Sequence, residues 1–98
     1  SAEKEPALGI TALGAASPNP ASENAKIDYS LATDFSNVTI SLFDALGNEI
    51  ACLFDGPQAS GMHSLELDSE ALALPSGQYF YKMTCGNFSK TMPLVIAR

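Results

Sequence analysis

The stretch Ser76–Arg98 decides the fold and reads SGQYFYKMTCGNFSKTMPLVIAR. Its first arm alternates apolar and polar residues with a period of two, which is typical of a β-strand with one buried face. The apolar face of this arm carries Tyr79, Tyr81, Met83 and Cys85. A tight turn at Gly86 joins it to a second arm with the apolar end Leu94-Val-Ile96. The pattern predicts a closing β-hairpin, without which we expect the core to be incomplete.

Further alternating segments precede the hairpin. Strands are predicted, in chain order, over Ile10–Ala16, Ala25–Leu31, Val38–Phe43, Glu49–Leu53 and a segment from His63 to Asp68. Ser17–Asn24 and Phe54–Ser60 carry turn residues and are expected loops, and Ser69–Leu74 has room for one helical turn. About seven short strands at regular spacing predict an all-β fold. We expect an immunoglobulin-like antiparallel β-sandwich with Greek-key connections.

Length and charge restrict the classes of function. The chain has 98 residues, which suits one domain, and a formal net charge of −6. Nucleic acids and anionic membrane surfaces repel such a chain, so neither is an expected partner. No apolar run approaches the ~20 residues of a membrane helix, so no direct membrane insertion is expected. The start is polar and unlike a signal peptide. We therefore expect a module of a longer protein, with residues 1–16 as a flexible linker that has room for a first strand and residues 17–98 as the domain.

No combination of residues predicts catalysis, a cofactor or a metal site. His63 is the one histidine, and its alternation in phase with Leu65 favours a core-edge position over a ligand or base. A structural zinc site needs four ligands of cysteine or histidine type, more than the two cysteines and one histidine provide. The acidic residues at the ends of the expected strands lack the spacing of a calcium loop; they are Asp44, Asp55, Asp68 and Glu70. We expect a protein that is not an enzyme.

Cys52 and Cys85 both fall in expected strands. A disulfide between them is allowed by their number, provided that their Cα atoms come within about 7 Å. Two buried free thiols are the preferred expectation, because free cysteine behaves as a small apolar residue.

Two aromatic features predict particular geometry. Tyr79 follows a loop at the start of a late strand, where its hydroxyl can bond upstream backbone as in a tyrosine corner. The alternative is a half-buried ring without that bond. Phe43 and Phe80 fall on the polar phase of two strands that neighbour each other in an immunoglobulin-like sheet. We expect them to meet on its outer face, either as a cross-strand pair alone or as part of a docking surface.

Several short motifs follow one another in an ordered series. They are Pro18-Asn-Pro20, Ile27-Asp-Tyr-Ser-Leu31, Val38-Thr-Ile-Ser-Leu-Phe-Asp-Ala-Leu-Gly-Asn-Glu-Ile50, Gly61-Met-His63, Leu74-Pro-Ser-Gly-Gln-Tyr-Phe-Tyr81 and Gly86 with Lys90. In this order and spacing, the chain from Ser17 to Arg98 resembles the type A C-terminal sorting domain of the type IX (Por) secretion system of Bacteroidetes. The immunoglobulin-like domain of flagellar hook-capping proteins is the nearest competitor.

The resemblance implies a secretion signal without enzymatic activity. Such domains direct a folded cargo, often a protease or adhesin, from the periplasm across the outer membrane. A sortase-like peptidase then removes the domain, and the cargo is attached to the cell surface. The implied partners are the translocon, an outer-membrane shuttle barrel, the sortase and the N-terminal cargo domain. The implied cleavage falls within Ser1–Ser17.

The resemblance also supplies candidate recognition residues. They are Pro18, Asn19, Pro20, Gly47, Gly77, Tyr79, Gly86, Lys90, Leu94, Val95, Ile96, Ala97 and Arg98. The glycines suit turns and Tyr79 suits packing, so Lys90, the Pro18–Pro20 segment and the tail Leu94–Arg98 are the stronger candidates. Pro93 removes a ladder donor, which predicts an edge strand or an interruption there. An edge strand can accept an added strand from a receptor.

Two other functions remain open at this point. One is a structural, adhesive or carbohydrate-binding module of a larger secreted enzyme. It needs an aromatic platform, for which Phe43, Phe54, Phe80 and Tyr81 are available. The other is a flagellar hook-capping domain, in line with the second resemblance.

Overall fold

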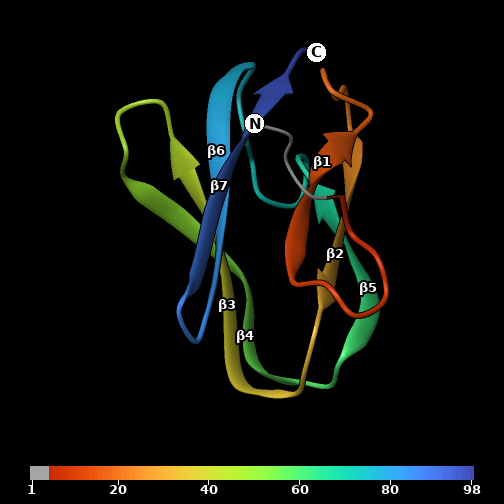
Figure 1. The fold of residues 1–98 in the computed structure, drawn as a ribbon. Coiled ribbons are helices and arrows are strands. Elements are labelled where there is room, and N and C mark those ends of the chain that lie inside the picture. Colours follow the sequence, from red (N-terminus) through yellow and green to blue (C-terminus); the bar gives the residue numbers. More distant parts are fainter. Residues whose placement is uncertain (1–4) are drawn as a thin grey trace.

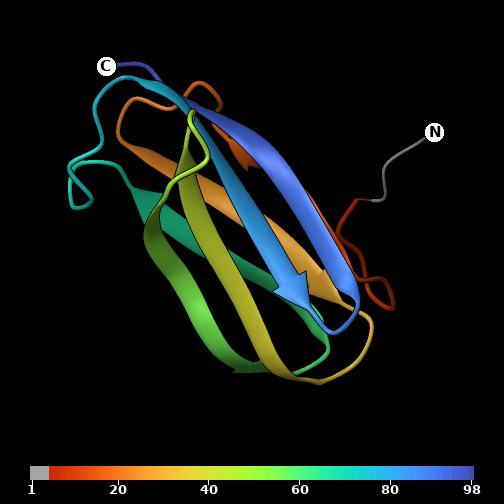
Figure 2. The ribbon, with the colours of Figure 1, turned by 90° about the vertical axis from the view of Figure 1, so that its left-hand side faces the viewer.

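The computed structural model describes residues 5–98, which form seven β-strands in two packed sheets (Figure 1). The strands are β1 (Ala12–Ser17), β2 (Asn24–Leu31), β3 (Phe35–Asp44), β4 (Glu49–Gln58), β5 (Gly61–Asp68), β6 (Gly77–Cys85) and β7 (Phe88–Ile96). One sheet has the order β1-β2-β5 and the other has the order β4-β3-β6-β7. In Figure 2 the four-stranded sheet faces the viewer, with β4 on the left and β7 on the right. The predicted all-β, immunoglobulin-like sandwich is confirmed.

Chain connections repeatedly cross between the two layers. The β3–β4 and β6–β7 pairs are hairpins within the four-stranded sheet, whereas β2–β3, β4–β5 and β5–β6 pass from one sheet to the other. Strands β1 and β7 are edge strands of different sheets and lie close together along one side of the sandwich. The arrangement leaves that side to be closed by other parts of the chain.

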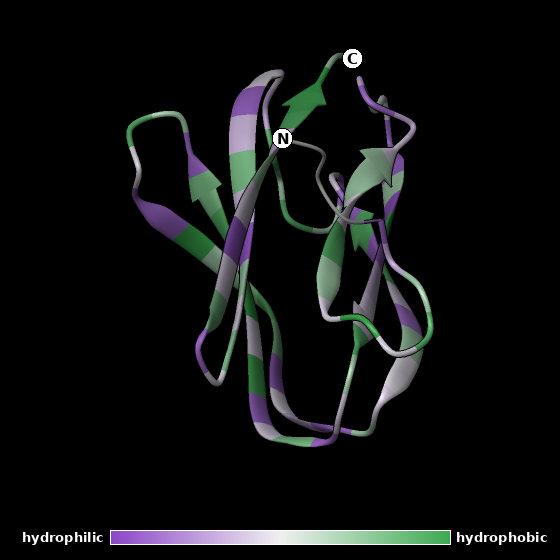
Figure 3. Cartoon of the chain, in the orientation of Figure 1, coloured by the Kyte–Doolittle hydropathy of each residue, from purple (hydrophilic) through white to green (hydrophobic). Residues whose placement is uncertain are grey.

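The core forms where the alternating apolar residues of both sheets meet (Figure 3). The four residues of the predicted inward face of β6 are all buried; they are Tyr79, Tyr81, Met83 and Cys85. Leu94 and Ile96 of β7 are also buried, and burial of an aliphatic side chain of this size contributes about 1.5–3 kcal/mol. Gly86 has a φ of 54°, a left-handed conformation that suits glycine in the tight turn of this hairpin. The closing hairpin therefore completes the core, as the sequence predicts.

Strand β4 is longer than the sequence predicts. The segment Phe54–Ser60 is an expected loop, but the strand continues to Gln58. Phe54 pairs with Ile40 and packs against the core, which keeps this half of the strand on the sheet. Pro57 is tolerated because β4 is an edge strand, where an N–H can be missing from the outer side.

The two cysteines differ in burial. Both are free thiols, on β4 and β6, which are separated by β3. Cys85 is buried as expected, and desolvation raises the pKa of its thiol. Cys52 is exposed, so the expectation of two buried thiols is wrong for this residue. The reason is a β-bulge of β4 between Cys52 and Phe54, which places Cys52 opposite Ser41 instead of on the core face.

His63 occupies the expected position at the edge of the core. Its ring is half-buried and stacks on Tyr29, with ring centroids 5.3 Å apart and an interplanar angle of 20°. Its Nε2 atom lies 2.7 Å from the carbonyl oxygen of Ala59. These contacts give His63 a packing role. Within residues 5–98, no group of three or more His, Cys, Asp or Glu side chains is arranged to hold a metal ion.

Candidate partner-recognition surface

Two of the stronger recognition candidates, the Pro18–Pro20 segment and the C-terminal tail, meet on the outer edge of β7. Residues Pro18–Ala21, here called the strap, leave the end of β1 and cross to the C-terminal half of β7. The backbone N–H of Ala21 donates to the carbonyl of Val95 at 2.8 Å, and the N–H of Ala97 donates to the carbonyl of Ala21 at 2.8 Å. Ala21 and Ile96 thereby form a parallel bridge. The strap joins the two sheets on the side where β1 and β7 approach.

Asn19 extends this pairing with its side chain. Its Oδ1 accepts a hydrogen bond of 2.9 Å from the backbone N–H of Val95, and its Nδ2 donates to the carbonyl of Pro93 at 3.3 Å. A side-chain amide offers one carbonyl and one N–H pair, as a backbone peptide unit does. Asn19 therefore occupies the edge of β7 in place of the backbone of a neighbouring strand. The peptide bonds before Pro18 and Pro20 are both cis.

The strap corrects one expectation about the C-terminal tail and one about the Pro18–Pro20 segment. The outer edge at Pro93–Ala97 is covered by the strap, so it is not open to an added strand. The strap also has a clear folding role, because Ala21 is fully buried and belongs to the core cluster. The expectation that the Pro18–Pro20 segment lacks a strong folding reason is therefore wrong.

Pro93 lies at a position where its missing N–H leaves the β6–β7 ladder intact. Peptide groups on a strand point alternately to its two sides. The N–H groups of Val95 and Ala97 point away from β6, toward the strap, and Pro93 shares their parity. β7 is an edge strand, as predicted, but the predicted loss of a ladder donor is wrong.

Arg98 fastens the end of the tail to the loop between β5 and β6. Its guanidinium Nη2 donates to the carbonyls of Leu74 at 2.7 Å and Ser69 at 2.9 Å. Its backbone N–H donates to the hydroxyl of Ser76 at 3.0 Å. The expected helical turn in this loop is a series of hydrogen-bonded turns, one of which joins the N–H of Leu74 to the carbonyl of Ser69 at 2.8 Å.

Tyr79 fastens the same loop from the opposite side. Its hydroxyl donates a hydrogen bond of 2.6 Å to the carbonyl of Pro75, four residues upstream. This is the back-bonding geometry that the sequence predicts for a tyrosine corner. Gly77 stands between these residues at the start of β6, opposite Ile96. Strap, tail and loop thus form one connected surface at this end of the sandwich.

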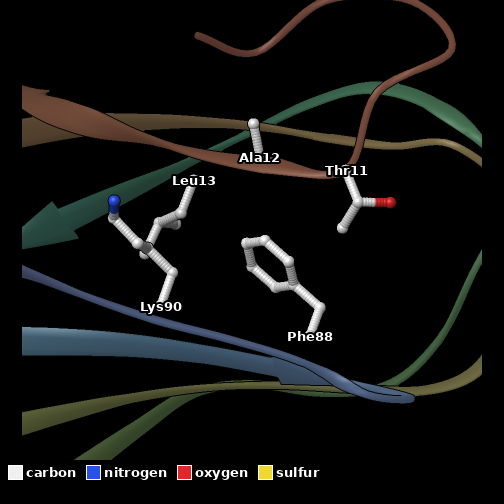
Figure 4. A pocket seen from close by; sticks show the side chains of 5 residues that line it. All are labelled: Thr11, Ala12, Leu13, Phe88 and Lys90. Atoms are coloured by element: carbon white, nitrogen blue, oxygen red, sulfur yellow. The ribbon is translucent and has the colours of Figure 1, made fainter. Parts of the chain in front are cut away.

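Lys90 lies on the inward phase of β7. It pairs with the buried Met83 and lines a hollow of about 160 Å³ between β1 and β7, together with Leu13 and Phe88 (Figure 4). An inward-directed charge on an edge strand protects a sheet against pairing with other chains. Lys90 therefore has a folding reason that its sequence position does not reveal.

Most of the chain matches a known domain family. A family model described as the FlgD Ig-like domain matches residues 15–87. The chain belongs to the FlgD Ig-like domain family. No curated protein matches the chain. The matched range of the FlgD Ig-like domain includes the strap and ends before β7, so the strap-to-tail contact joins residues inside the match to residues outside it.

The hairpin between β3 and β4 in this FlgD Ig-like domain is ordered by Asp44. Its carboxylate accepts hydrogen bonds from the backbone N–H groups of Asn48 at 2.9 Å and Leu46 at 3.0 Å. The backbone hydrogen bond from Asn48 is the main cause that lowers the pKa of Asp44. Gly47 has a φ of 89°, which a residue with a Cβ rarely adopts. The turn thus explains Gly47 without a partner.

Phe43 and Phe80 meet on the outer face of the four-stranded sheet, as predicted. They are directly opposite each other in the β3–β6 register, and Phe80 in turn is opposite Pro93. Both rings are half-buried and line a hollow of about 240 Å³ with Gly47, Lys82 and Thr91. The pair contributes about 0.2–1 kcal/mol as a cross-strand contact.

The sequence interpretation missed one buried link of the FlgD Ig-like domain. The hydroxyl of Tyr81 donates to the carbonyl of Gly14 at 2.6 Å, across the two sheets. Gly14 lies in a bulge of β1, and a Cβ built there would lie 2.8 Å from the carbonyl oxygen of Asp28. Gly14 was the sequence signal that could have revealed this bulge, because a glycine inside a strand of alternating apolar residues often marks a bulge.

Proposed function

We propose that this FlgD Ig-like domain is a C-terminal secretion signal of the type IX system, without enzymatic activity of its own. It accompanies a folded cargo from the periplasm across the outer membrane to the cell surface. The translocon, an outer-membrane shuttle protein and a sortase-like peptidase are its partners. FlgD Ig-like domains occur both in such sorting domains and in flagellar hook-capping proteins, which supports this assignment at the level of the family.

The contact between strap and tail is the observation that carries the proposal. The contacts between the strap and the end of β7 join residues 74 or more positions apart in sequence and form one hydrogen-bonded edge. A receptor that contacts this edge meets both motifs at once. Folding alone explains Gly47 and Gly86, so these glycines add little to the proposal.

The pairing of β1 supports a cleavage site in the first part of the segment that the resemblance implies. β1 pairs with β2 from Ala12 to Ser17, and Tyr81 is bonded to Gly14 within it. A cut inside this strand requires that an edge strand be pulled off the sheet. We place the cleavage before Ala12, in the N-terminal part of the segment that the resemblance implies.

A fusion experiment tests the proposal. Residues 1–98 are fused to the C-terminus of a neutral reporter in a bacterium with a type IX system and, as a control, in the same strain lacking the translocon. We expect the reporter at the cell surface of the first strain only, shortened by the mass of this domain. Retention of the intact fusion in the periplasm of both strains would contradict the proposal.

A role in a flagellar hook cap is the second candidate, favoured by the family to which the chain belongs. It predicts that the fusion stays in the periplasm of both strains. The carbohydrate-binding alternative has lost support, because Tyr81 is fully buried and Phe54 packs against the core. Phe43 and Phe80 are then the remaining members of the expected aromatic platform, and both are half-buried.

A further inference from the structure

The two sheets of the sandwich are unequal on the side formed by β4 and β5. Strands β1 and β7 lie close together on the opposite side. Counted from there, β2 and β5 follow β1 in one sheet, whereas β6, β3 and β4 follow β7 in the other. The last strand of the larger sheet, β4, therefore has no counterpart in the three-stranded sheet.

The burial of side chains agrees with this overhang of β4. Ile40 and Leu42, on the inward face of β3, are fully buried. Phe54 and Ala51 of β4 lie opposite them in the register and share their inward direction, yet both are only half-buried. Leu65 on the inward face of β5 is also half-buried. An apolar surface between β4 and β5 is therefore incompletely covered by residues 5–98.

The strand next to this surface, β5, has an unpaired edge. Among residues 5–98, no strand pairs with the side of β5 that faces away from β2. The N–H of Ser69 donates to the carbonyl of Glu23 at 2.9 Å, so the odd-numbered residues of β5 direct their backbone groups to β2. The even-numbered Met62, Ser64 and Glu66 direct theirs outward. About six residues of an added strand, roughly 20 Å, fit along this edge.

The edge of β5 lacks the features that protect the other three edge strands. The strap covers the end of β7, β4 contains a bulge and Pro57, and β1 contains a bulge. β5 pairs with β2 over all 8 of its residues without a register shift, and its sequence has no proline or lysine. A regular edge of this kind can accept a strand from another chain.

The charges on this side favour a basic partner. β4 and β5 have no lysine or arginine and four acidic residues, which are Glu49, Asp55, Glu66 and Asp68. Lys26 of β2 lies opposite the exposed Glu66, but its amine is 4.0 Å from the carboxylate of Asp28. A second copy of the chain would bring the same carboxylates to this edge, whereas a basic segment complements them.

We propose that an extended segment of a partner protein, in which apolar residues alternate with lysine or arginine, adds to the edge of β5 as a fourth strand. Its backbone pairs with the outward groups of Met62, Ser64 and Glu66. Its apolar side chains turn inward and cover Phe54 and Leu65, while a basic side chain lies opposite Glu66 on the outer face. This inference goes beyond the proposed function, because it applies to any partner that carries such a segment.

Titration with peptides of stated composition tests the site. The probe is an eight-residue peptide of alternating lysine and valine, and the control is the same peptide with glutamate in place of lysine. We expect the lysine peptide to bind at least tenfold more tightly and to shift the amide resonances of Ser64, Glu66 and Phe54 in the ¹⁵N-labelled chain. Hydrogen exchange at Ser64 and Glu66 should become slower. Shifts confined to β1 and β7, equal binding of both peptides, or no binding at millimolar peptide would overturn the inference.

Variants of the chain separate edge pairing from charge. Ser64→Pro removes an outward N–H while leaving the β2–β5 ladder intact, and we expect at least tenfold weaker binding of the lysine peptide. Glu66→Lys should weaken its binding severalfold. Glu5→Lys changes the net charge equally, in the segment before the opposite edge strand β1, and should not. Thermal unfolding of each variant checks that it is folded. Equal affinity of the wild type and both β5 variants would contradict the site, and the exchange data on the wild type decide the matter if a variant unfolds.

A second copy of the chain is the competing occupant of this edge. Sedimentation velocity and hydrogen exchange of the chain without peptide, over a range of protein concentrations, test it. We expect a monomer with fast exchange at Ser64 and Glu66 at every concentration. If exchange at these amides slows as a dimer forms, two copies pair through β5 and the basic partner is wrong.

Discussion

The hydroxyl of Tyr81 donates a 2.6 Å hydrogen bond to the carbonyl of Gly14, a residue 67 positions earlier and in the other sheet. Tyr81 is fully buried, so this bond satisfies a hydroxyl and a carbonyl that have no access to water there. Burial raises the pKa of Tyr81 to about 12, and a hydrogen bond with the backbone of Ala16 acts in the opposite direction. The link thereby connects the bulge of β1 to the centre of the closing hairpin.

Removal of this hydroxyl should destabilise the domain. In Tyr81→Phe the carbonyl of Gly14 loses its partner, and we expect the free energy of unfolding to fall by about 1–3 kcal/mol. The folded-state pKa of Tyr81 is raised above its unfolded value, so its contribution is full below pH 10 and is lost as the pH rises toward about 12. Urea unfolding at pH 7 and between pH 10 and 12 measures both effects. A variant as stable as the wild type, with the same loss at alkaline pH, would contradict this account.

Gly14 should not tolerate a side chain. A Cβ at this position lies 2.8 Å from the carbonyl oxygen of Asp28 and 3.0 Å from Cγ of Pro6, so Gly14→Ala forces the backbone of β1 to move. We expect a loss of about 1–3 kcal/mol in the free energy of unfolding. Ala15→Ser is the matched control, because Ala15 is the exposed neighbour in the same strand. Thermal unfolding compares the two variants. Equal melting temperatures would show that the bulge accommodates a Cβ atom without loss of stability, which would contradict the prediction.

The position of the strap on β7 should depend on the side-chain oxygen of Asn19, which accepts a hydrogen bond from Val95. Asn19→Ala removes both side-chain bonds to β7, and we expect a loss of about 1–2 kcal/mol together with faster hydrogen exchange at the amide of Val95. Asn19→Asp retains an oxygen acceptor for that amide and loses only the donor to Pro93, so exchange at Val95 should stay slow. If both variants exchange equally fast, the side chain does not hold this edge.

The β3–β4 hairpin should loosen in acid. Hydrogen bonds to the carboxylate, chiefly from the backbone of Asn48, lower the pKa of Asp44 in the folded chain. Its contribution is therefore present above the unfolded pKa and disappears as the pH falls through the lowered folded value. Asp44→Ala should remove this acid dependence and speed exchange at the amides of Leu46 and Asn48. Measurement of exchange between pH 2 and 5 tests the prediction, and an unchanged pH profile in the variant would contradict it.

The alternation of apolar and polar residues predicted the two sheets and their buried faces. It did not predict burial where a β-bulge interrupts the pairing of two strands. The alternation of Tyr79, Tyr81 and Met83 corresponds to their burial in β6, because a regular strand keeps its phase. Cys52 was expected to be buried because free cysteine behaves as a small apolar residue, but the bulge in β4 places it opposite Ser41 and it is exposed. Single-residue insertions of this kind leave no periodic signal in the sequence.

The surface was only partly predictable for a different reason. The resemblance drew attention to Asn19 and to the tail, but no pattern in the sequence places a side-chain amide against the backbone of Pro93 and Val95. The sequence also does not show that the nitrogen of Pro93 faces the strap and not β6. Contacts between residues more than 70 positions apart require the tertiary structure.

The pairing of Ala21 with Val95 and Ala97 means that neither segment presents its finished form alone. A polypeptide whose synthesis stops before Pro93 has no partner for the strap and leaves the buried methyl group of Ala21 uncovered. The assembled edge is therefore a discontinuous surface, which exists only when both segments are folded against each other.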